Sequence, residues 1–313
     1  MSDTQATLSK SNESPLQAYF ILAMGVAAVS LAAIFIRLAQ DEAVPSIVIA
    51  GGRLLIAALI LTPAVLRRPD YVQQITTLNR RDFGLALVSG FFLAMHFASW
   101  VTSLEYTTVL ISVVLVVTTP IWVGLLEVFF LNARLSRPII IGLVVALIGG
   151  VIIGLSGSTE ISSDSDDQIL GAVLSIIGAI TVSVYLVIGR KLRGHLALTP
   201  YIWLVYSCAA TVMLIIIGLR SAPILGHGVD GYLWILALGL IPQLIGHSSL
   251  NYALAYLPAT YVSMATQLEP LLSALVAYFI FTEIPSGGQV VGGFVIIVGV
   301  SLATYAQRQT ESA

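Results

Sequence analysis

The sequence predicts an all-α polytopic membrane protein with ten transmembrane helices, arranged as two inverted five-helix repeats. Three observations lead to this prediction. Hydrophobic residues make up 58% of the 313 residues and charged residues only 10%, whereas a soluble domain has about 25% charged residues. Ten apolar stretches are long enough to cross a bilayer, and the two halves of the chain repeat one pattern.

The ten stretches each approach the ~20 mostly apolar residues that a membrane-spanning helix requires. They lie near residues 18–39, 44–66, 83–104, 106–130, 137–157, 168–190, 199–219, 231–254, 256–281 and 287–306. The sequence lacks the alternation of polar and apolar residues over ~10-residue segments that is typical of a membrane β-barrel. We therefore expect ten helices and no strands.

The basic residues predict the orientation of the chain. If the N-terminus is cytoplasmic, 11 of the 14 Lys and Arg residues fall on the cytoplasmic side, whereas the external loop STEISSDSDDQ is acidic. Cytoplasmic loops carry an excess of Lys and Arg, so we expect a multi-pass protein of the inner cell membrane with both termini in the cytoplasm. The polar residues 1–15 are expected to be a disordered tail and not a signal peptide.

The two halves of the chain follow the same plan. Residues 99–149, moved by 150 positions, match the second half at ten positions without a gap. The matches include Tyr106/Tyr256, Pro120/Pro270, Gly142/Gly292 and Gly149/Gly299. The first and sixth spans align at an offset of 153, which pairs Arg37 with Arg190. Because five spans per half is an odd number, the second half is expected to enter the membrane inverted, as in many secondary transporters.

This repeat predicts the domain organisation. We expect a cytoplasmic tail at 1–15, a first repeat at 16–157, an acidic external linker at 158–167, a second repeat at 168–307 and a cytoplasmic tail at 308–313. The glycines along the last span of each repeat form small-residue faces that let helices approach closely. These faces either pack within the chain or form the contact of a homodimer.

The chain resembles the EamA-type branch of the drug/metabolite transporter superfamily. That family pairs a tyrosine or similar residue at the start of the fourth span of a repeat with a mid-span proline, a glutamate after the proline and a glycine-rich last span. The second half shows this pattern as Tyr256, Glu269-Pro270, Glu283, Gly292, Gly293 and Gly299, and the first half as Tyr106, Pro120, Gly142, Gly149 and Gly150. Ala133 departs from it, because the second half has Glu283 at that place, and Arg53 is the family-like arginine of the second span.

The resemblance covers about residues 18–306 and implies ten spans in two inverted repeats. It also implies a central cavity lined by the first, third, fourth, sixth, eighth and ninth spans, with the fifth and tenth at the periphery. The branch handles amino acids, drugs and other metabolites, so the resemblance indicates a transporter without naming the substrate.

Eight residues are candidates for substrate binding: His96, Trp100, Tyr185, Gln243, His247, Asn251, Gln267 and Glu269. Gln243, His247 and Asn251 are four residues apart and share one helix face. Polar groups at this depth either hydrogen-bond to a neighbouring helix or line a wet cavity. Trp100 either stacks on an apolar or aromatic solute or belongs to the interfacial belt, and Tyr185 either faces the cavity or packs.

The charged residues inside the spans allow two interpretations each. Glu269 either binds and releases a proton or is a static partner of a buried arginine or of backbone freed by Pro270. Arg53 either attracts a carboxylate substrate or has a structural role. In the structural role it forms an ion pair or extends outward to the membrane interface. Glu127 is expected to pair with Arg134 near the inner end of its span. Pro120 and Pro270 each remove a backbone hydrogen bond and are expected to be helix hinges.

Other classes of function lack support. The net charge of −2 argues against a nucleic-acid partner, and the single cysteine, Cys208, excludes a disulfide framework and a cysteine-based metal site. We find no ligand spacing for a metal, no nucleotide-binding motif and no catalytic motif, so no metal, cofactor or enzyme activity is expected.

The sequence therefore favours alternating-access export of a small organic metabolite, with amino acids as the leading candidates. The energy would come from protons acting through Glu269 or from the solute gradient. The alternatives are uptake or exchange of another metabolite or drug, an intramembrane enzyme, and a non-transporting scaffold.

Overall fold

The computed structural model describes residues 15–107, 109–133, 135–156, 165–281 and 286–312. Residues 1–14 of the tail expected at 1–15, most of the acidic linker, Arg134 and Glu283 lie outside the described residues. Helices account for all the regular secondary structure of the described residues, which confirms the all-helical prediction over this part of the chain. The last helix continues to Ser312, so it includes most of the stretch expected as the C-terminal tail.

The first half contains α1 (Pro15–Val29), α2 (Ala32–Asp41), α3 (Ser46–Leu66), α4 (Pro69–Thr76), α5 (Arg80–Tyr106), α6 (Val109–Val116), α7 (Thr119–Leu131) and α8 (Arg137–Leu155). The second half contains α9 (Ser165–Leu192), α10 (Leu198–Leu219), α11 (Val229–Leu238), the π-helical segment η1 (Gly239–His247), α12 (Ser248–Ala253), α13 (Ala259–Ala265), the 3₁₀ segment η2 (Thr266–Leu268), α14 (Glu269–Phe281) and α15 (Gly287–Ser312).

Eight stretches within the described residues are long and apolar enough to cross a membrane. They are Leu16–Asp41, Ser46–Leu66, Arg80–Tyr106, Ser112–Leu131, Asp167–Leu192, Leu198–Leu219, Val229–Ala253 and Gly287–Ala306. They coincide with eight of the ten predicted spans. The predicted fifth span is represented by a shorter apolar helix, Arg137–Ile153, and the predicted ninth span is divided among α13, η2 and α14.

The two mid-span prolines explain where the fourth and ninth predicted spans break. A proline removes the hydrogen bond to the carbonyl four residues before it. For Pro120 that carbonyl belongs to Val116, the last residue of α6, and the Thr119 hydroxyl donates to it at 2.6 Å. For Pro270 it belongs to Thr266, where the helix changes to a 3₁₀ turn. The helix geometry is therefore interrupted one turn before each proline, at equivalent places in the two halves.

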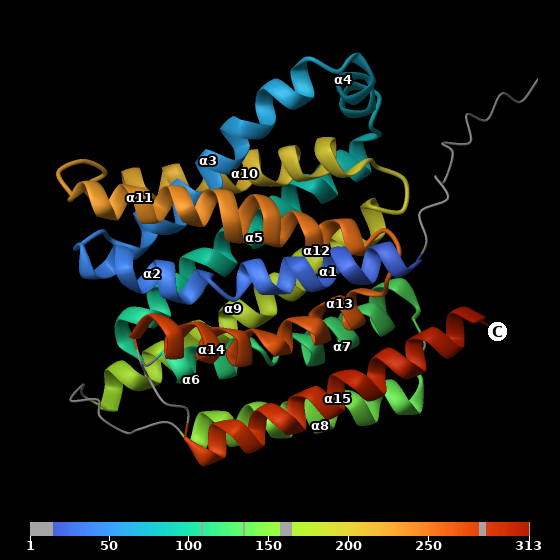
Figure 1. Ribbon diagram of the computed structural model, residues 1–313. Helices are drawn as coiled ribbons and strands as arrows, with labels where there is room; N and C mark the ends of the chain where they lie inside the picture. Colours follow the sequence, from blue (N-terminus) through green and yellow to red (C-terminus); the bar gives the residue numbers. More distant parts are fainter. Residues whose placement is uncertain (1–14, 108, 134, 157–164, 282–285, 313) are drawn as a thin grey trace, which may run out of the picture.

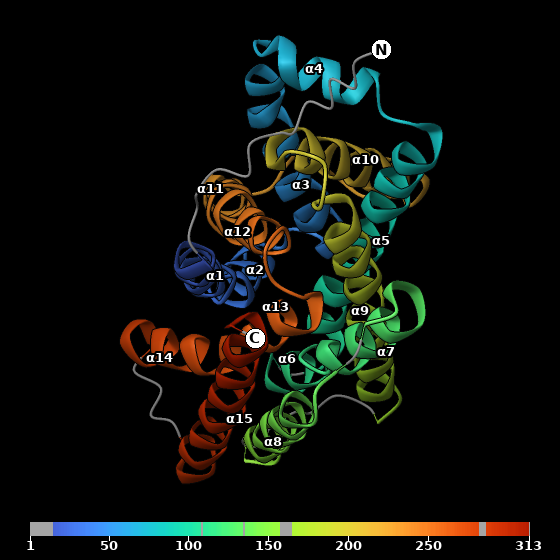
Figure 2. The ribbon, with the colours of Figure 1, turned by 90° about the vertical axis from the view of Figure 1, so that its right-hand side faces the viewer.

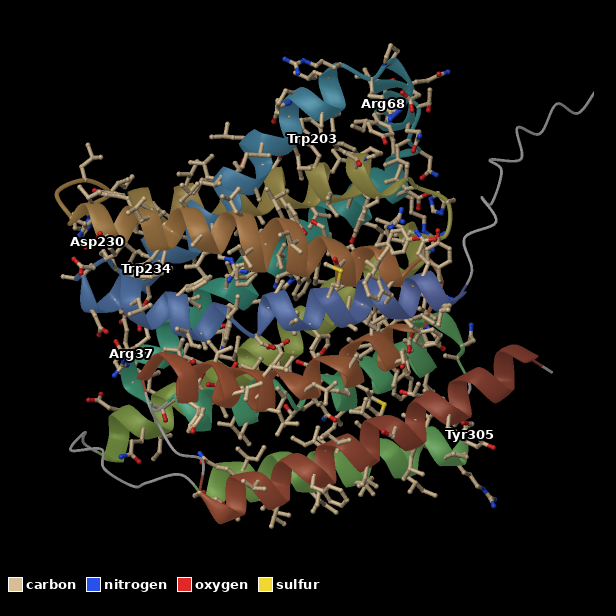
Figure 3. The ribbon with its side chains drawn as sticks, in the orientation of Figure 1. Arg37, Arg68, Trp203, Asp230, Trp234 and Tyr305 are labelled. Carbon is tan, nitrogen blue, oxygen red and sulfur yellow. The ribbon has the colours of Figure 1, made fainter. Side chains whose placement is uncertain are left out.

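The helices lie side by side in one bundle (Figure 1). Helix α1 begins and α15 ends at the same end of the bundle, which we call the α1 end; we call the opposite end, where α2 finishes, the α2 end. Arg68 lies toward the α1 end and Arg37 at the α2 end (Figure 3). Seen along the bundle, α8 and α15 form one edge, whereas α3, α4 and α10 lie at the opposite edge (Figure 2).

Helices α8 and α15 pack through paired glycines. A Cβ atom added to Gly149 would lie 2.6 Å from the carbonyl oxygen of Gly292, and one added to Gly292 would lie 2.6 Å from that of Gly149. Gly142 and Gly299 have the same reciprocal 2.6 Å relationship. These four glycines therefore form a close helix contact within the chain.

Candidate functional site

A cavity of about 50 Å³ lies between the two halves. Its lining includes four of the eight candidate residues, His96, Trp100, His247 and Glu269, and is otherwise mostly apolar. The remaining lining residues are Val29, Ala32, Val116, Val117, Thr119, Val182, Leu186, Leu250 and Thr266. Together they come from the first, third, fourth, sixth, eighth and ninth predicted spans, the set that the resemblance implies. The volume is enough for a few water molecules.

Two aromatic rings from α5 form one wall of the cavity. The His96 and Trp100 rings are stacked with their planes 13° apart and their centroids 5.7 Å apart. The Nδ1 of His96 lies 2.9 Å from the carbonyl oxygen of Gly178 in α9, which can only accept, so this nitrogen donates. The buried indole nitrogen of Trp100 has no hydrogen-bond partner among the described residues. Because Trp100 is buried and lines the cavity, it is not an interfacial belt residue.

Arg53 lies behind this wall. Its guanidinium carbon is 4.0 Å from the centre of the Phe97 ring, and the Phe97 ring contacts both His96 and His247, with centroids 4.8 and 5.2 Å apart. The Arg53 side chain is fully buried, which excludes the expectation that it extends outward to the interface. Its Nε donates to Oε1 of Gln243 at 3.1 Å.

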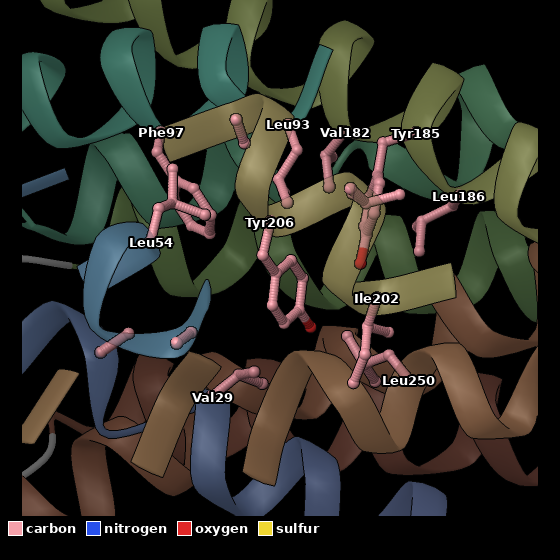
Figure 4. Packing of buried hydrophobic residues seen from close by; sticks show 14 of the residues in the cluster. Val29, Leu54, Leu93, Phe97, Val182, Tyr185, Leu186, Ile202, Tyr206 and Leu250 are labelled. Carbon is pink, nitrogen blue, oxygen red and sulfur yellow. The ribbon is translucent and has the colours of Figure 1, made fainter. Parts of the chain in front are cut away.

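The polar face of the eighth predicted span is divided between several partners. His247 lines the cavity, whereas Gln243 contacts Arg53 and Asn251 donates to the Tyr185 hydroxyl. Gln243, Asn251 and Tyr185 are all fully buried and do not line the cavity. Figure 4 shows Tyr185 and Phe97 among the apolar side chains of this region. Gln243 and His247 belong to the π-helical segment η1, and such segments occur frequently at functional sites.

Gln267 lies within the 3₁₀ segment that interrupts the ninth predicted span, and Glu269 is the first residue of the helix that follows it. Glu269 lines the cavity and does not form an ion pair with Arg53 within 4.0 Å in the described structure. Gln267 is buried and donates from Nε2 to the carbonyl oxygen of Val117 at 3.2 Å. That carbonyl lies in the break between α6 and α7, so Gln267 joins the two interrupted helices.

Glu127 has a contact that the sequence did not reveal. Its buried carboxylate accepts hydrogen bonds from the backbone nitrogens of Ala259 and Thr260, at 2.8 and 2.9 Å, and from the Thr260 hydroxyl at 2.5 Å. These donors open α13, so Glu127 of the first half caps a helix of the second half at the α1 end. The expected partner, Arg134, lies outside the described residues. In the sequence, Glu127 stands out only as a carboxylate within an apolar span. That pattern does not identify the start of α13 as its partner.

Two equivalent arginines close the ends of helix pairs. Arg190 in α9 donates from Nη1 to the carbonyl oxygen of Leu254 at 2.7 Å, at the α1 end. Arg37 in α2 makes the corresponding contact with Leu104 at the α2 end, but at 3.5 Å. The repeat offsets relate Arg37 to Arg190 and Leu104 to Leu254. The same contact therefore occurs in both halves and is shorter at the α1 end.

A further arginine, Arg193, adds hydrogen bonds to backbone carbonyls at the α1 end. Arg193 donates from Nε to the carbonyl oxygen of Asn251 at 3.0 Å and from Nη1 to that of Leu196. Burial of its guanidinium lowers the pKa of Arg193 from its usual value, although the two carbonyl contacts compensate for part of the lost hydration.

Comparison with known proteins places the chain among transporters. A model of the EamA-like transporter family matches residues 16–155 and again residues 169–305. An uncharacterized transporter of Archaeoglobus fulgidus is 26% identical over 259 residues, which cover 80% of this chain and 84% of that protein. A solved crystal structure superposes with a TM-score of 0.77 over 95% of this chain and 100% of that one, at 19% identity, and supports the fold alone.

Two further relatives have names that include a substrate. A probable terminal-alkyne amino-acid exporter of Streptantibioticus cattleyicolor is 29% identical over 202 residues, 60% of this chain and 61% of that protein. An S-adenosylmethionine uptake transporter of Rickettsia felis is 26% identical over 264 residues, 84% of each chain. One relative is thus named for export and the other for uptake.

Proposed function

The chain belongs to the EamA-like transporter family, and on that basis we propose that it is a secondary transporter that exports a small organic metabolite across the cytoplasmic membrane. The observation that carries the proposal is the cavity between the two halves, lined by His96, Trp100, His247 and Glu269. A mostly apolar cavity with a few polar groups is typical of a small-molecule site. Substrate sites of inverted-repeat transporters lie at such an interface.

An amino acid is the favoured substrate. Two relatives are named for the transport of a terminal-alkyne amino acid and of S-adenosylmethionine, and both molecules contain an amino-acid unit. The stacked His96 and Trp100 rings offer an apolar surface for a side chain, and Glu269 offers a carboxylate for an ammonium group. Uptake or exchange of a similar solute is the alternative, because the two relatives are named for opposite directions.

We assign the α1 end to the cytoplasm, from the excess of Lys and Arg in the loops at that end. The proposed topology has ten crossings in two repeats, 16–157 and 168–307, with both termini inside; the fifth crossing is α8, and the ninth consists of α13, η2 and α14. Contacts of Glu127, Arg190 and Arg193 join helices at this end. They support a state in which the cytoplasmic side is closed, and transport would require them to break.

The interruptions before Pro120 and Pro270 supply the hinges of this movement. A broken helix bends at lower cost because fewer backbone hydrogen bonds hold it straight. Glu269 follows one of these breaks directly and lines the cavity. Protonation of Glu269 would therefore act where the helix bends, which is the basis for proton coupling in the proposed mechanism.

Solute flux in proteoliposomes tests the proposal. Purified protein would be reconstituted and screened with neutral, aromatic and cationic amino acids, with and without an imposed pH gradient. We expect saturable flux, lost in Trp100→Ala and His247→Ala. In Glu269→Gln, the response to pH should disappear while downhill exchange remains.

The control is Leu219→Ala, which alters an exposed side chain at the end of α10. Equal flux by the intact chain and by the Trp100 and His247 variants would contradict the assignment of the cavity. Retention of the pH response in Glu269→Gln would remove the proton-coupling role. Normal folding of all variants, with no flux of any solute by the intact chain, would instead favour the scaffold alternative.

A further inference from the structure

Three hydrogen-bond donors without partners meet behind the cavity wall. Nη1 and Nη2 of Arg53 and Nε2 of Gln243 are buried, and none has a hydrogen-bond partner among the described residues. The two side chains are held together by the 3.1 Å bond between Nε of Arg53 and Oε1 of Gln243. Their free donors come from both halves of the chain, since Arg53 lies in α3 and Gln243 in η1.

An unpaired guanidinium in this position requires an anion. A buried charge is costly unless it is paired and hydrogen-bonded, and among the described residues the guanidinium has only neutral partners, the Gln243 amide oxygen at 3.1 Å and the face of Phe97 at 4.0 Å. Within the described residues, no carboxylate lies within 4.0 Å of Arg53. The two amino groups that remain free are the pair with which arginine binds a carboxylate through two parallel hydrogen bonds.

The position of Arg53 connects these donors to the cavity. Phe97 separates Arg53 from the cavity-lining rings of His96 and His247 and contacts all three. Glu269 lines the same cavity as these two histidine rings. The flexible arginine side chain is therefore one side-chain layer from the space that a solute would occupy.

We propose that Arg53 and Gln243 form a carboxylate-binding subsite beside the cavity, so that the transported solute carries a carboxylate group. This inference rests on the proposed function and makes it more specific. A solute carboxylate would bind Nη1 and Nη2 of Arg53 together with Nε2 of Gln243. An ammonium group on the same solute would lie toward Glu269, and this pair of opposite charges fits an amino acid in its zwitterionic form.

Glu269 is the competing source of a carboxylate within the protein. When the solute is absent, a change in helix position would bring Glu269 to Arg53 if the two opposite charges pair. The test therefore separates a carboxylate from solution from the carboxylate of Glu269.

The test uses acetate, the smallest suitable carboxylate, and acetamide, its neutral isostere. Thermal unfolding of the full chain in lipid nanodiscs is followed while either compound is titrated at constant ionic strength, set with sodium chloride. We expect acetate to raise Tm in a saturable manner and acetamide to have no effect. Arg53→Gln should weaken the apparent affinity for acetate about tenfold or more, because the charged fork is lost.

Three further variants identify the source of the effect. Arg190→Gln, which removes a partly buried guanidinium bound to a backbone carbonyl, should retain the response to acetate. Gln243→Leu should weaken the response and replaces Arg53→Gln if that variant does not fold. Glu269→Gln should bind acetate at least as tightly as the intact chain, because the internal competitor is removed.

Several results would overturn the proposal. Equal effects of acetate and acetamide, or an acetate response that survives in Arg53→Gln, would show that Arg53 does not bind the carboxylate. A response confined to Glu269→Gln would assign the subsite to the carboxylate of Glu269. Because sodium chloride sets the ionic strength, a site that binds any anion equally would show no change in Tm as acetate replaces chloride, and that result would also contradict the proposal.

The outcome is independent of the flux measurement. Acetate binding without flux of any solute would contradict the proposed transport function and leave the subsite standing. Flux of solutes without carboxylates, in a protein that shows no acetate response, would contradict the subsite and leave transport standing.

Discussion

Gln267 and Val117 occupy equivalent positions in the two halves of the chain, 150 residues apart, and are joined by a 3.2 Å hydrogen bond from the Gln267 amide to the Val117 carbonyl. A contact between equivalent residues lies on the pseudo-two-fold axis that relates the halves. The bond also joins the two interrupted helices beside the cavity. The axis therefore passes through the region where both helices are broken.

Replacement of Gln267 by leucine is expected to destabilise this junction. The change leaves the carbonyl of Val117 without its side-chain donor in a buried region, which costs about 1–3 kcal/mol. We expect a lower Tm in detergent or nanodiscs than for the intact chain. Gln17→Leu, at an exposed position of α1, is the control, and an equal Tm for the two variants would contradict this role of Gln267.

Glu127→Gln is expected to loosen the start of α13. An amide group has one acceptor oxygen in place of the two that receive the three hydrogen bonds, and its NH₂ group would face backbone donors. Hydrogen bonds to a charged group contribute about 1.5–3 kcal/mol, so exchange of the Ala259 and Thr260 amide hydrogens should accelerate about tenfold or more. Hydrogen-exchange mass spectrometry measures this rate.

The control for that measurement is Glu105→Gln. Glu105 also accepts a bond from a helix N-terminus, from the Ser46 nitrogen at 3.3 Å, but it is exposed and lies at the α2 end. Its substitution should leave α13 unchanged. Unaltered exchange at residues 259 and 260 in Glu127→Gln would show that the carboxylate does not hold this helix.

The two equivalent arginine contacts should respond unequally to substitution. Arg190→Gln removes a 2.7 Å hydrogen bond and should increase hydrogen exchange near residues 251–257. Arg37→Gln removes a 3.5 Å contact made by an exposed side chain, so its effect on hydrogen exchange near residues 101–107 should be smaller. The reason is that exposed and long contacts contribute little. Hydrogen exchange of both variants, each the control of the other, checks this order, and a larger effect of Arg37→Gln would reverse the interpretation.

Gly149→Ala is expected to separate α8 from α15. The added methyl group would meet the Gly292 carbonyl oxygen at 2.6 Å, and such overpacking costs about 1–3 kcal/mol. Gly84 in α5 is a matched control, because a Cβ atom added there meets nothing within 4 Å. Gly84→Ala should slightly raise Tm through the higher helix propensity of alanine, so a comparable rise in Gly149→Ala would contradict the close contact.

The apolar pattern predicted most helices of this protein because each helix depends on local composition. It did not reveal the break in the ninth span, where the mostly apolar residues 256–281 change from α-helix to 3₁₀-helix and back just before Pro270. Hydropathy counts residues and does not register a missing backbone hydrogen bond. The proline itself indicated a hinge, although the exact break depends on which groups donate hydrogen bonds to the freed carbonyl.

The site was harder to predict because its contacts join residues far apart in sequence. The cavity includes His96, Trp100, His247 and Glu269, which the sequence singled out, but Gln243 and Asn251 turn to Arg53 and Tyr185 instead. A helical face is known from spacing alone only if the helix is regular, and η1 is π-helical. The partner of Glu127 is 132 residues away, and a sequence without an alignment contains no signal for that distance.

The glycine contacts between α8 and α15 have a consequence for how the two halves are related. Gly149 meets Gly292 while Gly142 meets Gly299, and the repeat makes Gly142 equivalent to Gly292 and Gly149 to Gly299. This reciprocal pairing is the geometry of an isologous two-fold interface, in which one patch serves as its own complement. Two glycine positions of one repeat, used twice, thus supply both close approaches of the helix pair, so a change at either position of the repeat would alter one approach and leave the other in place.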